Sequence, residues 1–98
     1  MLKKQWLKTR PVCKVTFALP EGTAARTAHL VGDFNNWDEK AEPMKKLKDG
    51  TFKTTVELEP GREYQYRYLV NSSEWINDDK ADKYAAHPYG GENSVVMT

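Results

Sequence analysis

The sequence predicts an all-β fold, a two-sheet antiparallel β-sandwich of the immunoglobulin-like (early-set) type. Three observations predict it. Short segments alternate apolar and polar residues with period two, turn residues separate these segments, and no segment carries an apolar helical face over three turns. The chain has 98 residues, which is about one domain. A thin core between two small sheets therefore accounts for the pattern best.

The first predicted strand begins at Cys13. Its inward face is read from residues of one parity, which are Cys13, Val15, Phe17 and Leu19. Turn residues follow at 20–23, and residues 28–32 predict a second short strand. Cys13 is the only cysteine, so no internal disulfide can form, and the reducing cytoplasm is the expected compartment. On the inward face, its thiol is expected to be inert.

The middle of the chain predicts a hairpin and then the longest strand. Asp49-Gly50 is a hairpin-turn signal, and residues 52–58 alternate after it. Pro60-Gly61 then turns the chain into residues 63–70, where three tyrosines alternate with polar residues. The tyrosines are predicted to point into the core, which places Arg67 on the outward face.

The last third predicts strands at Trp75-Ile76 and at 93–97, with room for one helical turn within 79–86. Asp78, Asp79 and Asp82 match no calcium-loop spacing and alternate with lysines, so a metal site is not expected. The favoured interpretation is a solvated turn in which the side chains of Asn77 and Asp78 bond to nearby backbone amides.

Residues 1–11 predict a basic, solvated leader, and residues 12–98 the folded domain. The first fourteen residues hold five basic side chains and no acidic one. Such a run usually keeps a terminus in water, although it could serve as a docking arm for an acidic partner. Trp6 within it is expected to pack down as an anchor. No apolar stretch is long enough for a signal peptide or a membrane span.

Composition and motifs exclude several functions. The formal net charge is +1, so a dedicated nucleic-acid binder is not expected. His29 and His87 lie in separate segments without metal-ligand spacing, and Gly90-Gly91 lacks the lysine of a phosphate loop. No acid/base constellation is present. We therefore expect no enzyme, no cofactor and no metal.

Two tryptophans in polar loops are the most informative residues. Trp37 follows Phe34-Asn35-Asn36, and Trp75 follows a turn that contains Ser72-Ser73. A large ring beside hydrogen-bonding residues suits a ligand with apolar and polar faces, such as a sugar. The alternative is that either ring closes one end of the sandwich core.

Five sequence blocks, taken in their order along the chain, resemble the isoamylase-type early-set domains. This group includes carbohydrate-binding module family 48. The glycogen-binding domain of the AMP-activated protein kinase β subunit is similar. The resemblance covers residues 12–98. The chain looks like the stand-alone prokaryotic members of the group. The blocks are Val31–Trp37, Asp49–Phe52, Tyr64–Val70, Glu74–Asp78 and Gly91–Val96.

The resemblance implies which residues contact sugar. In glycogen-binding members, two tryptophans stack on glucose rings, and they match Trp37 and Trp75. A basic residue in the aromatic strand matches Arg67, and an asparagine near the last strand matches Asn93. An apolar residue precedes that asparagine in the family, and Tyr89 stands there in this chain.

The expected function is non-catalytic binding of an α-1,4-glucan, such as glycogen, starch-like polymer or maltooligosaccharide, by aromatic stacking. The alternative is an adaptor that docks onto a polysaccharide-metabolism enzyme and binds no sugar, because domains of this set also act as packing modules in branching and debranching enzymes. The sequence leaves both open.

Overall fold

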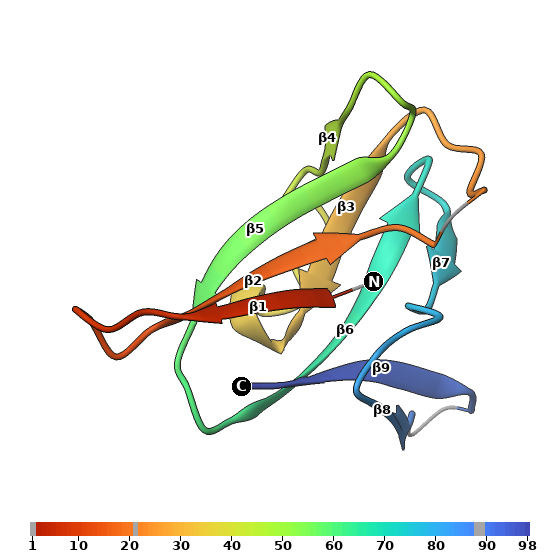
Figure 1. Cartoon of the computed structure of the whole chain (residues 1–98). Coiled ribbons are helices and arrows are strands. Elements are labelled where there is room, and N and C mark those ends of the chain that lie inside the picture. Colours follow the sequence, from red (N-terminus) through yellow and green to blue (C-terminus); the bar gives the residue numbers. More distant parts are fainter. Residues whose placement is uncertain (1, 21, 88–89) are drawn as a thin grey trace.

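Two antiparallel sheets face each other in this chain (Figure 1). The computed structural model describes residues 2–20, 22–87 and 90–98. One sheet has the order β1-β2-β5-β4 and the other the order β3-β6-β9-β8, with β7 paired to β6 as well. The predicted all-β class is confirmed. The strands are β1 (Leu2–Trp6), β2 (Cys13–Ala18), β3 (Ala28–Gly32), β4 (Lys45–Lys46), β5 (Phe52–Leu58), β6 (Glu63–Val70), β7 (Glu74–Ile76), β8 (Lys83–Ala86) and β9 (Glu92–Met97).

The core lies between the sheets and is formed by the residues of inward parity. Phe17 of β2 and Tyr66 of β6 are fully buried. Their ring centroids lie 4.9 Å apart at 72°, an edge-to-face contact that joins the two sheets. Cys13 is buried in the same layer, and this burial raises the pKa of its thiol. The predicted inert thiol is therefore consistent with its position.

Strand β6 is the centre of the second sheet. It pairs with β3 along Tyr66–Val70, with β9 along Glu63–Tyr66 and with β7 along Tyr68–Val70. Because Tyr66 and Tyr68 point inward, Gln65 and Arg67 point outward, as the alternation predicts. The outer face of this sheet carries the candidate site described below.

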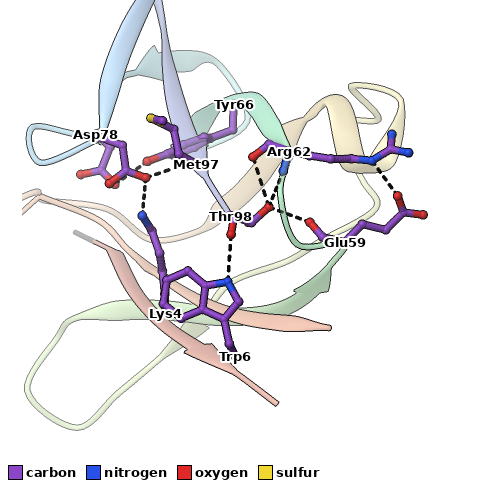
Figure 2. Close-up of polar contacts among 9 residues, drawn as sticks. Lys4, Trp6, Glu59, Arg62, Tyr66, Asp78, Met97 and Thr98 are labelled. Carbon is purple, nitrogen blue, oxygen red and sulfur yellow. Dashed lines mark hydrogen bonds and ion pairs between the residues drawn. The ribbon is translucent and has the colours of Figure 1, made fainter. Parts of the chain in front are cut away.

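The prediction of a solvated leader is wrong for residues 2–6, which form the edge strand β1. Leu2 pairs with Phe17 and packs against the core. The Trp6 indole N–H donates to the backbone oxygen of Thr98 at 2.8 Å (Figure 2). Lys4 forms an ion pair with Asp82 at 2.6 Å. Asp82 precedes β8 and Thr98 follows β9, so both partners flank strands of the other sheet, which the local sequence cannot reveal. Trp6 is thus anchored, although its ring is 54% exposed.

Two further expectations are corrected near Asp78. The optional helical turn within 79–86 is absent, and strand β8 occupies its second half. Asp78 is fully buried rather than solvated. Its carboxylate accepts the hydroxyl hydrogens of Tyr66 at 2.8 Å and Tyr68 at 2.9 Å, and the Lys80 backbone N–H at 3.0 Å. Of these three bonds, only the one from the Lys80 backbone N–H is of the predicted kind, a bond between the Asp78 side chain and a nearby backbone amide.

The buried Asp78 network changes the acidity of its members. Burial, followed by the charge of the nearby carboxylate, raises the pKa of both Tyr66 and Tyr68 far above the ordinary range. Burial by itself would raise the pKa of Asp78. The pKa of Asp78 nevertheless lies below its ordinary value, and the hydrogen bonds donated by the Lys80 backbone N–H and the Tyr66 hydroxyl are among the interactions that lower it. Asp78 is therefore a charged structural group.

Among the residues that the structure describes, no helix is long and apolar enough to cross a membrane.

Candidate functional site

A groove of about 390 Å³ lies on the outer face of the sheet centred on β6. A second hollow of about 310 Å³ adjoins it, because Trp37, His87 and Asn93 line both. The first is lined by Trp37, Glu39, Arg67, Trp75, His87 and Asn93, and the second adds Asp33 and Gln65. Residues far apart in the sequence thus converge on one surface.

Trp37 is held in place by the turn that follows β3. The 3-10 helix η1 (Asp33–Asn35) ends the strand, and Asn36 and Trp37 then adopt φ values of 57° and 56°. This left-handed conformation is uncommon for a bulky side chain and needs support from its surroundings. The Trp37 backbone N–H donates to the Gly32 carbonyl at 2.9 Å, and its indole N–H donates to Asp33 Oδ1 at 2.9 Å. The ring is half-buried and lines both hollows.

Trp75 comes to the same groove from strand β7. Ile76 next to it packs against the core, so the alternation of the strand turns Trp75 outward. It pairs with Leu69 of β6, and its ring is 40% exposed. Neither tryptophan is sealed in the core, and both line one groove. The geometry therefore favours two rings at a surface groove over the alternative, in which the rings close the ends of the core.

Arg67 and Asn93 line the same groove as the two rings, and a side-chain hydrogen bond holds each of them. Arg67 Nη2 donates to the Glu92 carbonyl at 2.7 Å. Asn93 Nδ2 donates to Gln65 Oε1 at 2.9 Å.

Within the described part of the chain, Arg67 Nε and Asn93 Oδ1 are buried and have no partner. A buried donor or acceptor without a partner costs roughly 1–3 kcal/mol. Arg67 and Asn93 both line the groove, with these two atoms buried beneath its surface.

Four of the five predicted site residues meet in this groove: Trp37, Arg67, Trp75 and Asn93. Tyr89 lies outside the described residues. The prediction omitted Glu39, His87, Gln65 and Asp33, which also line the two hollows. Gln65 could have been found, because it shares the outward parity of Arg67 on β6. His87 and Glu39 lie outside the strands, where period two gives no signal.

The arrangement suits binding and offers no chemistry of its own. Within residues 2–20, 22–87 and 90–98, no three histidine, cysteine, aspartate or glutamate side chains are grouped so that they could hold a metal ion. Two rings, amides, a guanidinium and carboxylates around a shallow groove are the groups that bind a ligand with apolar faces and a polar rim.

The fold and this groove define a small β-sandwich binding module. A family model described as carbohydrate-binding module 48 (isoamylase N-terminal domain) matches residues 14–90. The chain belongs to this family, which confirms the resemblance found in the sequence and identifies a non-catalytic carbohydrate-binding module.

Two curated relatives are similar to the chain. It is 38% identical to a 1,4-alpha-glucan branching enzyme of Butyrivibrio fibrisolvens over 61 residues, 62% of this chain and 10% of the relative. It is 32% identical to a 1,4-alpha-glucan branching enzyme of Photobacterium profundum over 90 residues, 89% of this chain and 12% of the relative. The chain thus spans about a tenth of the length of these curated relatives.

Proposed function

We propose that this protein binds an α-1,4-glucan such as glycogen or a linear maltooligosaccharide, with Trp37 and Trp75 as stacking surfaces. The observation that carries the proposal is that these rings share one groove with the Arg67 guanidinium and the Asn93 side-chain amide. A sugar hydroxyl is both donor and acceptor, so sugar hydroxyls suit the polar groups of both side chains.

The family and its relatives support the choice of sugar. The family is a carbohydrate-binding one, and both relatives are named as enzymes that act on 1,4-alpha-glucan. A shallow groove that stays partly wet gives weak affinity, with a dissociation constant on the order of micromolar to millimolar. We place this function in the cytoplasm, as the single cysteine of the chain suggests. Tyr89 completes the proposed site, together with Trp37, Trp75, Arg67 and Asn93.

Isothermal titration with maltoheptaose tests the proposal, with a cello-oligosaccharide of equal length as the control ligand. Trp37→Ala and Trp75→Ala are each expected to weaken maltoheptaose binding at least about tenfold. Each substitution removes a large apolar surface on which the C–H face of a glucose ring packs, and burial of such a side chain is worth about 1.5–3 kcal/mol. Trp6→Ala is the matched control, because Trp6 is exposed on β1 and lines neither hollow. It should leave binding unchanged.

Three outcomes oppose the proposal. Equal affinity for the two oligosaccharides contradicts the α-glucan assignment. No heat with either sugar favours the adaptor alternative, in which the module contacts only a polysaccharide-metabolism enzyme. Loss of the thermal transition in both tryptophan variants indicates that the rings close the core instead.

A further inference from the structure

The outer face of the other sheet carries an excess of unpaired positive charge. We call it the lysine face and define it by Lys3 of β1, Lys14 of β2, Lys45 of β4 and Lys53 of β5. Inward parity belongs to Val15 and Phe52, which are buried, so Lys14 and Lys53 point outward. Lys3 pairs with Thr16 and Lys45 with Lys53, which places both on the same side.

None of these four lysines has an acidic partner within the described part of the chain. Four other cations do have one: Lys4 with Asp82, Arg10 with Glu57, Arg62 with Glu59 and Lys83 with Glu63. Glu57 of β5 lies on the same face opposite Lys14, but its carboxylate already pairs with Arg10. The formal net charge of +1 therefore conceals an excess of positive charge on this side of the sandwich.

Two of these lysines oppose each other directly. Lys45 and Lys53 are register partners across β4 and β5, and like charges in that relation destabilise a sheet. They flank a hollow of about 360 Å³ whose lining also includes Leu47, Pro43 and three threonines. Leu47 in this lining is 36% exposed. Thr16 and Thr55, which also line the hollow, form a hydroxyl–hydroxyl hydrogen bond of 3.0 Å.

We infer that the lysine face docks a protein partner through an acidic segment whose carboxylates lie between Lys45 and Lys53. Charge complementarity selects the sign of the partner. An apolar side chain and threonine methyl groups beside the charges resemble the centre and rim of a protein interface. The cations are lysines rather than arginines, so the bidentate fork that favours phosphate is missing from the face.

This face lies on the opposite sheet from the groove, because the groove residues belong to β6, β7, β9 and the loops next to them. A partner and a ligand in the groove could therefore bind at the same time. The inference goes beyond the proposed function and does not depend on it.

A short poly-glutamate peptide is the probe, with titration followed by calorimetry and by amide chemical shifts at low salt. Its addition is expected to shift the amides of β2 and β5 and to leave those around Trp75 unchanged. Lys45→Gln/Lys53→Gln should weaken peptide binding roughly five- to tenfold, since each exposed charge pair contributes up to about 1 kcal/mol. Raised salt should weaken binding of the original chain as well.

Arg26→Gln/Lys80→Gln is the matched control, because it removes the same charge from two exposed positions outside the face. It should change the affinity by less than about twofold. Equal losses in both double variants would show that only net charge matters, which overturns the inference. Absence of shifts in β2 and β5 does the same.

Parallel measurements test whether another kind of partner binds the lysine face. Tighter binding of polyphosphate or of anionic lipid vesicles than of poly-glutamate would assign the face to another class of partner. Sedimentation at increasing protein concentration tests a second copy of the chain: a dimer that Lys45→Gln/Lys53→Gln abolishes would overturn the inference in favour of self-association. Both double variants should melt within a few degrees of the original chain, which keeps the comparison free of folding effects.

Discussion

Asp33 holds the ring of Trp37 and joins it to the central strand. Its Oδ1 accepts the indole N–H at 2.9 Å, while its Oδ2 accepts the backbone N–H of Gln65 at 2.7 Å. One carboxylate thus connects the turn after β3 with β6, beyond the point where the pairing of these strands ends at Gly32. The orientation of the Trp37 ring in the groove is therefore set by Asp33, a residue that is not aromatic itself.

Asp33→Ala is expected to weaken maltoheptaose binding about three- to tenfold, because it removes a charge-assisted hydrogen bond worth about 1.5–3 kcal/mol, only part of which orients the ring. Calorimetry measures the change. In a Trp37→Phe background, which lacks the indole N–H, the same substitution should have little further effect. Additive losses in the double variant would show that Asp33 acts independently of the ring.

Gly32→Ala is expected to destabilise the fold by about 3 kcal/mol or to rearrange the turn that carries Trp37. An added Cβ would lie 2.5 Å from the carbonyl oxygen of Gln65 and 2.8 Å from Cβ of Tyr66. Both neighbours belong to the central strand and cannot move without disturbing its pairing. Urea denaturation measures the loss, with Ser73→Ala at an exposed turn as the control. Equal stability of both variants would contradict the tight approach of these strands.

Protonation of Asp78 is expected to destabilise the protein at low pH. Its pKa is lowered in the folded state, so its contribution is complete above the unfolded value of about 3.9 and is lost as pH falls through the folded pKa. Urea denaturation between pH 7 and pH 2 measures this loss. Asp78→Asn should cost about 2 kcal/mol at neutral pH, because an amide serves the two tyrosine hydroxyls less well. The variant should also lose less stability below about pH 4.

Glu42→Gln is the control for this titration, because Glu42 lies outside the Asp78 network and its side chain accepts a hydrogen bond from the half-buried Thr54. Its stability should follow that of the original chain across the range. A pH profile that is identical in Asp78→Asn and in the original chain would show that other carboxylates cause the acid sensitivity.

Lys45→Glu is expected to stabilise the fold by about 0.5 kcal/mol, because it converts a like-charge cross-strand pair with Lys53 into an opposite-charge one. The gain should shrink at high salt, where the interaction is screened. Lys48→Glu in the neighbouring turn makes the same change of net charge without a register partner. Chemical denaturation of the two variants therefore separates the pairwise effect from the change in total charge.

Local patterns were sufficient for most of the strands. Period two at Cys13–Leu19 and at 63–70 identified β2 and β6, and Asp49-Gly50 identified the β4–β5 turn, where Gly50 has a φ of 88°. These features depend on neighbours within a few residues. For the same reason, alternation on β6 placed Arg67 on the outward face before any partner strand was known.

The errors occurred where the stabilising partner is distant in sequence. Residues 2–6 look like a solvated basic run until Trp6 meets Thr98, which follows β9 of the other sheet (Figure 2). Lys4 likewise meets Asp82, which precedes β8. Asp78 looks like a turn residue until Tyr66 and Tyr68 surround its carboxylate. A charged residue becomes a core residue only when such partners neutralise the cost of its burial.

Alternation and turn chemistry, which are local along the chain, determined the class of fold from the sequence by itself. The resemblance of five ordered blocks to a known family indicated that family and four residues that line the groove. Tertiary structure decided that Trp37 and Trp75 share one surface, that Asp33 aligns a ring and that four lysines gather on the opposite face. Those relations depend on which strands become neighbours, and strand order is fixed by long-range hydrogen bonding and burial rather than by any segment alone.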